Sequence, residues 1–159
     1  MVVGVLLVIG GATGSSDATN AAFEAQINRM IALYELEDCI TRTGFVDAAR
    51  VSGHLFACDA VVLPFRDGVS FRRGSLLAAL AHGRAVITTQ SREAMPELVD
   101  GLNIRLVPPE SAPAIVLAVT ELLDAPQLRA RLEQGARELA ASFSWDLIAS
   151  RTLAFYRSV

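Results

Sequence analysis

The sequence contains no lysine, and all 14 of its basic residues are arginine. Charged residues make up only 19% of the chain, and the net charge is −3. This balance argues against a general nucleic-acid-binding surface, because such a surface needs positive charge spread over one face of the protein. Any site for an anion must therefore be local. Arginine suits such a site, since its planar fork matches the geometry of a phosphate group.

Reactive side chains are also scarce. The two cysteines, Cys39 and Cys58, lack metal-ligand spacing and are expected to be free, buried thiols of a cytosolic protein. The two histidines, His54 and His82, support no catalytic triad. The N-terminal apolar run is too short for a membrane span, and it lacks the positively charged start of a signal peptide. We expect a cytoplasmic protein with no membrane span, no nucleic-acid partner and no metal or other cofactor.

Apolar runs alternate with helical patterns along the chain. Strands are expected at 2–11, 38–46, 60–65, 85–89 and 103–109, and helices at 21–36, 47–59, about 74–81, 111–125, 126–143 and 144–159. The runs at 2–11, 60–65 and 85–89 show no polar alternation, which predicts burial on both faces in a parallel sheet. The pattern predicts an α/β, Rossmann-like, doubly wound parallel sheet. We expect one domain over 1–159, with a helical C-terminal part at about 111–159.

The stretch VVLPFRDGVSFRRGSLLAALAHGRAVITT, residues 61–89, leaves a strand and enters an apolar helix through Arg72, Arg73, Gly74 and Ser75. A helix start exposes free backbone N–H groups, and ligands of open parallel sheets bind beyond the carboxyl ends of the strands. These residues therefore predict a site for negative charge, such as a diphosphate. The alternative is that the arginines are solvated or pair with Asp67 or Glu97.

Two further strand ends fall at Gly10–Gly11 and at the turn formed by Gly44, Phe45 and Val46. The stretch GGATGSS at 10–16 fails the phosphate-loop pattern, because no Gly-Lys-Ser/Thr follows it. A glycine turn that closes a strand is the alternative interpretation.

The order of motifs resembles the C-terminal, nucleotide-sugar-binding domain of retaining GT-B glycosyltransferases (group 1, family 4 type). The stretches that carry the resemblance are LLVIGGATG, TRTGFVD, ACDAVVLPF, GSLLAALAHGRAVITT, and ELVDGLNIRLVPP followed by FSWDLIASRTLAFYR. Together they span nearly the whole chain.

The resemblance implies a set of sugar-donor-binding positions. Two glutamates of the family, separated by seven residues, fall on Ser70 and Ala78, and neither position is acidic here. The family's backbone amides for sugar and diphosphate correspond to Phe71 through Ser75, where Arg72 and Arg73 could add charge. The resemblance places Gly10, Gly11, Gly44, Phe45, Val46 and Ala78 near the nucleotide base and ribose.

The implied activity is transfer of a sugar, hexosyltransferase-like, from a nucleoside diphosphate to an unknown acceptor. The family's N-terminal, acceptor-binding GT-B domain is missing from the chain, so we expect a truncated domain that is inactive in isolation. The closing helix normally crosses to that missing domain, which predicts that Phe143, Trp145, Phe155 and Tyr156 are partly bare. Such a patch favours self-association. The alternatives are a degenerate, non-catalytic binding or assembly module of this fold, and an unrelated flavodoxin-like or receiver-like domain.

Overall fold

A computed structural model describes residues 4–10 and 18–158. The chain divides into two compact units, Met1–His54 and Leu55–Val159. That the chain forms one domain stays a prediction. No helix in the described ranges is long and apolar enough to cross a bilayer.

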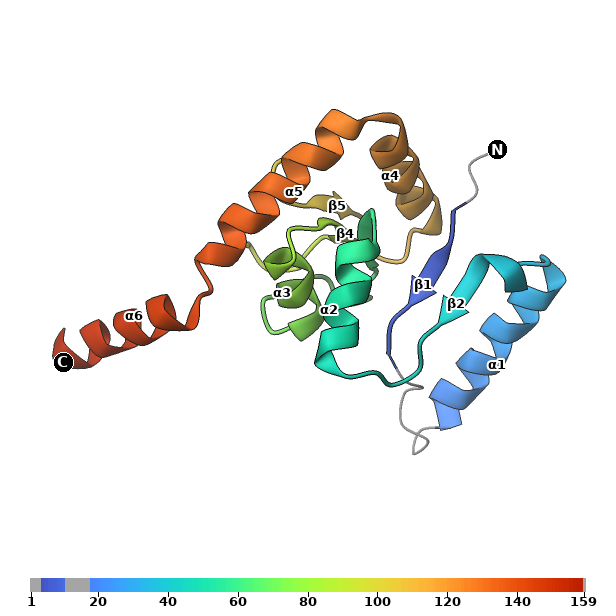
Figure 1. The fold of residues 1–159 in the computed structure, drawn as a ribbon, viewed down its shortest axis with the longest axis horizontal. Helices are drawn as coiled ribbons and strands as arrows, with labels where there is room; N and C mark the ends of the chain where they lie inside the picture. Colours follow the sequence, from blue (N-terminus) through green and yellow to red (C-terminus); the bar gives the residue numbers. More distant parts are fainter. Residues whose placement is uncertain (1–3, 11–17, 159) are drawn as a thin grey trace. The chain divides into compact units, whose positions relative to one another are not determined.

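The first unit is a small parallel βαβ arrangement. Strand β1, Leu6–Val8, pairs in parallel with β2, Ile40–Arg42, and the register sets Leu6 opposite Ile40. Along the chain, helix α1, Ala18–Leu33, and a 3₁₀ turn, η1, Glu37–Cys39, connect the two strands (Figure 1). The parallel pairing confirms the prediction for the N-terminal apolar run. The predicted burial of both strand faces is wrong here, because Leu6 and Val8 are exposed.

Helix α1 has apolar residues at helical spacing on one face, but little of that face is buried. Ile27 and Ile31 are half-buried, whereas Phe23, Met30 and Tyr34 are exposed. Two three-residue strands offer a helix of four turns too little apolar surface to cover the whole stripe.

The second unit contains a three-stranded parallel sheet with the order β3-β4-β5. Its strands are β3, Ala60–Leu63, β4, Ala85–Thr89, and β5, Arg105–Val107. Its helices are α3, Gly74–Ala81, α4, Ala112–Asp124, α5, Pro126–Ala141, and α6, Trp145–Ser158, and α2, Ala48–Ala57, spans the boundary between the units. The predicted alternation of strands and helices is therefore confirmed.

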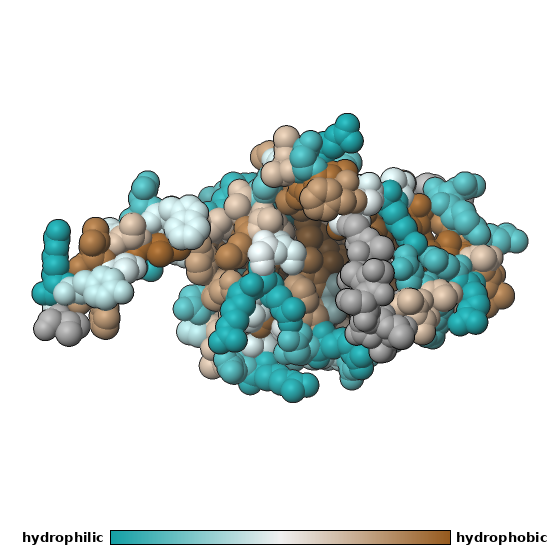
Figure 2. All heavy atoms as spheres, turned by 90° about the horizontal axis from the view of Figure 1, so that it is seen from below, coloured by the Kyte–Doolittle hydropathy of each residue, from teal (hydrophilic) through white to brown (hydrophobic). Residues whose placement is uncertain are grey.

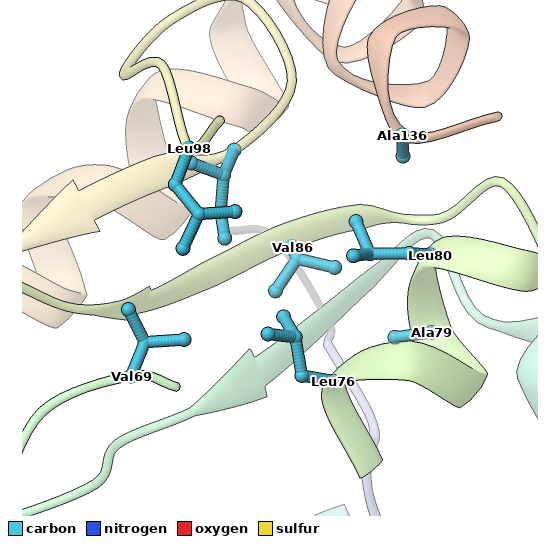
Figure 3. Packing of buried hydrophobic residues seen from close by; sticks show 8 residues of the cluster. Val69, Leu76, Ala79, Leu80, Val86, Leu98 and Ala136 are labelled. Atoms are coloured by element: carbon cyan, nitrogen blue, oxygen red, sulfur yellow. The ribbon is translucent and has the colours of Figure 1, made fainter. Parts of the chain in front are cut away.

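Strand β4 is the centre of this unit, and all five of its residues are buried. Alternate side chains enter two separate clusters, because successive residues of a strand face opposite sides of a sheet. On one side, Val86 packs with Leu76 and Leu80 of α3 and with Ala136 of α5 (Figure 3). On the other side, Ile87 joins a cluster formed with α4 and α5. Helices on both faces of a parallel sheet confirm the doubly wound fold class.

The helix boundaries follow the signals in the sequence. The Arg50 amide donates to the Asp47 carboxylate at 2.8 Å, and the Ala114 amide donates to the Ser111 hydroxyl at 3.4 Å. Asp47 and Ser111 therefore cap α2 and α4. Gly83 ends α3 with a φ of 60°, a left-handed conformation that glycine adopts without steric cost.

Helix α6 has no buried residue. Figure 1 shows it leading away from the end of α5, and Figure 2 shows brown, hydrophobic atoms along it at the left. Trp145, Phe155 and Tyr156 are exposed, which confirms the expectation for these three. Phe143 is half-buried, and so partly bare as expected, and its ring centroid lies 4.6 Å from that of Phe71. Self-association through this helix stays a prediction.

Candidate functional site

The loop of residues 64–73 leaves the carboxyl end of β3 and is held against the carboxyl end of β4. The Val69 amide donates to the Thr89 carbonyl at 3.1 Å, and the Thr89 hydroxyl donates to the Phe65 carbonyl at 2.6 Å. Gly68 has a φ of 87°, and a Cβ there would lie 2.5 Å from the Gln90 carbonyl oxygen. The close approach of loop and strand therefore requires glycine at this position.

This loop delivers the chain to α3 with an open helix start. Arg73 is the N-cap, with φ −84° and ψ 104°, and its side chain makes no capping hydrogen bond. Its carbonyl accepts from the amides of Leu76 and Leu77. Gly74 and Ser75 are exposed, and no acceptor among the described residues takes a hydrogen bond from their amides. Open amides at the positive end of a helix dipole attract anions.

The two adjacent arginines have different surroundings. Arg73 forms an ion pair with the Asp67 carboxylate, and its guanidinium carbon lies 4.6 Å from the centroid of the Phe65 ring. Arg72 is exposed and has no hydrogen bond or ion pair with any described side chain. Arg73 therefore pairs with Asp67, as the alternative interpretation of the sequence has it, and Arg72 is solvated.

The remaining predicted residues of this loop flank the helix start. The Ser70 carbonyl accepts from the Arg73 amide at 3.1 Å, which closes the turn before α3. Phe71 is half-buried and packs on the cluster around Val86. Ala78 is half-buried on the second turn of α3. The structure therefore brings Ser70 through Ser75 into one short stretch at the edge of the sheet.

The predicted residues of the first unit also gather at strand ends. Gly10 and Gly44 form an antiparallel bridge, and the Gly10 amide donates to the Thr43 hydroxyl at 3.1 Å. Phe45 is 93% exposed and Val46 is half-buried. Gly11 lies outside the described residues. A role of these residues toward a nucleotide base stays a prediction.

Three features of the second unit's site escaped the sequence analysis. Thr89 anchors the loop, Phe143 covers Phe71, and a pocket of about 250 Å³ opens beside Val69. The pocket is lined by Val69, Gln90, Ser91, Glu93, Met95, Leu98 and Leu106. No pattern in the sequence predicts these contacts, because residues 69 and 89 are distant along the chain, and so are residues 71 and 143. Across the described ranges, no three His, Cys, Asp or Glu side chains are grouped as metal ligands.

The thiol of Cys58, two residues before β3, has a perturbed pKa. The pKa of the Cys58 thiol is raised above its usual value, first by burial and then by the neighbouring Asp59 carboxylate, while Arg84 opposes the shift. A raised pKa keeps the thiol protonated and unreactive. Both cysteines are free, as the sequence analysis expected, but each is half-buried rather than buried.

Among proteins of known sequence, the chain is similar to several sugar transferases. It is 29% identical over 116 residues to the phosphatidyl-myo-inositol mannosyltransferase of Mycolicibacterium smegmatis, covering 73% of this chain and 30% of that protein. It is 27% identical over 135 residues to the alpha-D-kanosaminyltransferase of Streptomyces kanamyceticus, covering 84% of this chain and 34% of that protein. The chain thus spans about a third of the length of these relatives.

Solved structures show the same fold. Anabaena HepE in complex with UDP matches 98% of this chain and 41% of its own, with a TM-score of 0.82 at 18% identity. The C-terminal domain of a glycosyl transferase group 1 family protein, LpcC of Francisella tularensis, matches 87% of this chain and 68% of its own, with a TM-score of 0.73 at 26% identity. Residues 4–125 also match the family described as glycosyl transferases group 1. The chain belongs to that family and has the Rossmann-like fold of a C-terminal GT-B domain.

Proposed function

We propose that this chain binds the nucleoside diphosphate sugar of a sugar-transfer reaction, with the diphosphate at the start of α3. The observation that carries the proposal is the exposed pair of open amides at Gly74 and Ser75. They stand at the carboxyl edge of a parallel sheet, where ligands of such folds bind. Family membership and the UDP and UDP-glucose complexes of HepE support a nucleotide sugar as the ligand.

In this proposal, the chain contributes to transfer by holding the sugar donor and stabilising the departing diphosphate. Helix amides that are already oriented need no rearrangement as negative charge develops on the leaving group. Arg72 adds an exposed positive charge next to them. We expect this chain alone to catalyse no sugar transfer, because none of its residues is proposed to bind the sugar acceptor.

A second candidate is a non-catalytic module of the same fold. The observation that favours it is the replacement of both family glutamates, by Ser70 and Ala78. Neither residue can accept hydrogen bonds from sugar or ribose hydroxyls as a carboxylate does. Binding of a nucleoside diphosphate separates the two candidates, since the non-catalytic module is expected not to bind it.

The test is isothermal titration of the 159-residue chain with UDP and with GDP, using two variants of one residue. Gly74 is the first residue of α3, where proline is tolerated, and the extended Arg73 before it suits a following proline. Gly74→Pro therefore removes one amide donor and leaves the helix in place. Gly74→Ala keeps that donor, and its Cβ meets no atom within 4 Å.

We expect wild type to bind at least one of the two nucleotides, and Gly74→Pro to bind it about 10- to 100-fold more weakly, as for a lost hydrogen bond to a charged group. Gly74→Ala should remain much closer to wild type. No binding by wild type, or equal losses in the two variants, would contradict the proposal. Circular dichroism of Gly74→Pro verifies that the helix is retained.

A further inference from the structure

Two neighbouring arginines lie beside the open amides, and their guanidinium groups differ in their contacts. The Arg73 guanidinium is paired with Asp67 and stacked on Phe65, so its charge is cancelled and its position is fixed from two sides. Arg72 is exposed, with no partner among the described side chains. Arg72 lies in the turn before α3, and Arg73 is the N-cap of the helix.

The partners of Arg73 both come from its own loop. Phe65 and Asp67 precede it by eight and six residues, so these contacts link the beginning of the segment 65–73 to its end. The backbone of the same loop is fixed by the bond from the Thr89 hydroxyl to the Phe65 carbonyl. The Arg73 side chain therefore holds the loop in shape immediately before the Gly74 and Ser75 amides.

We infer that the two arginines have different roles in the site. Arg72 supplies the side-chain positive charge that meets the diphosphate, whereas Arg73 is a positioning residue whose charge is neutralised by Asp67. The inference rests on the proposed function and adds to it which cation contacts the ligand. It also makes Asp67 a residue that lowers affinity for anions, because its carboxylate cancels a positive charge next to the site.

Three variants of the 159-residue chain separate these roles. Arg72→Gln removes the exposed charge. The double variant Asp67→Asn, Arg73→Gln removes the ion pair without changing the net charge, and Asn and Gln can still hydrogen-bond to each other. Asp67→Asn alone leaves Arg73 with an uncancelled charge. Isothermal titration uses UDP and inorganic pyrophosphate as probes, so that contacts to the diphosphate are measured with and without a nucleoside.

We expect Arg72→Gln to weaken binding of both probes about tenfold, as for one lost charge-assisted hydrogen bond. The double variant should stay within about twofold of wild type, because an exposed pair of opposite charges adds no net attraction. Asp67→Asn should bind about two- to threefold more tightly, by removal of one nearby negative charge in a high-dielectric environment.

Salt dependence gives a readout that a purely structural role would not change. Added sodium chloride screens the attraction between an arginine and a phosphate. Wild type and the double variant should lose affinity with salt to the same extent, and Arg72→Gln should lose less. If the double variant weakens binding and also reduces the salt dependence as much as Arg72→Gln does, Arg73 leaves Asp67 to meet the ligand and the inference is overturned.

Failure of the inference is distinguishable from failure of the proposed function. Binding by wild type together with unchanged affinity in Arg72→Gln overturns the division of roles and leaves the diphosphate site standing. Absence of UDP binding by wild type contradicts the proposed function, and the inference with it.

Discussion

The ring centroids of Phe71 and Phe143 lie 4.6 Å apart, and the two ring planes are inclined by 42°. This contact joins the loop that precedes α3 to the turn that joins α5 and α6, residues that are far apart along the chain. Phe71 also packs on the core cluster around Val86. The start of the proposed diphosphate site is therefore fastened to the core by an aromatic side chain.

Single and double alanine variants of Phe71 and Phe143 should reveal this contact in the free energy of unfolding. Each single change should lower the free energy of unfolding. The double change should lower it by less than the sum of the two single losses, and the difference should be about 0.5–1.5 kcal/mol for an aromatic pair. Urea denaturation measures it. Phe45→Ala is the control, because a side chain that is 93% exposed should change stability by less than about 0.5 kcal/mol. Strict additivity would show that the rings do not interact.

Thr89 is buried, and its hydroxyl ties the loop to β4 through the Phe65 carbonyl. Thr89→Val keeps the shape of the side chain but removes this hydrogen bond. The Phe65 carbonyl still accepts from the Gly68 amide at 3.3 Å, so the cost in the free energy of unfolding should be about 0.5–1.5 kcal/mol. Thr120→Val is the matched control, because the Thr120 hydroxyl donates to the Val116 carbonyl on an exposed helix face. Equal stability of the two variants would rule out an anchoring role for Thr89.

Gly68→Ala should destabilise the second unit by more than about 1 kcal/mol. The residue has a φ of 87°, and the added Cβ would lie 2.5 Å from the Gln90 carbonyl oxygen. Gly53→Ala is the control within a helix, where the new Cβ meets nothing within 4 Å. That variant should gain about 0.5–1 kcal/mol, because alanine favours a helix over glycine. A neutral Gly68→Ala would mean that the loop does not approach β4 closely.

The Cys58 thiol should lower the stability of the chain at alkaline pH. Its pKa is raised in the folded state by burial and by Asp59. Between the unfolded and the folded pKa, the unfolded chain has released the proton that the folded chain keeps, so the free energy of unfolding falls as pH rises. In a Cys39→Ala background, the rate of alkylation by iodoacetamide should reach half its maximum at a higher pH in the native chain than in urea. Coinciding profiles would contradict the shift.

The sequence predicts the architecture of the second unit well because its signals are local. A run such as 85–89, with no polar alternation, indicates a strand buried on both faces, and β4 is such a strand. Asp47, Ser111 and Gly83 mark helix ends because capping depends on residues within one turn. The same reasoning fails for β1, whose burial depends on neighbours that its own pattern does not contain.

The position of the candidate site is also predictable, since strand ends and helix starts can be read from the pattern. The division between Arg72 and Arg73 is not, because it depends on whether Asp67 and Phe65 fold back toward one of them. The role of Phe143 is equally hidden, since its contact with Phe71 joins residues 72 positions apart. Contacts between distant residues are decided by the whole fold, and no local pattern records them.

The most direct test of the account follows the backbone amides themselves. In ¹H–¹⁵N correlation spectra of the 159-residue chain titrated with UDP, the account predicts large, saturable shifts at the Gly74 and Ser75 amides, with smaller shifts at Phe71 and Arg72. Saturable shifts that leave the Gly74 and Ser75 amides unmoved, or the absence of any shift, would contradict it.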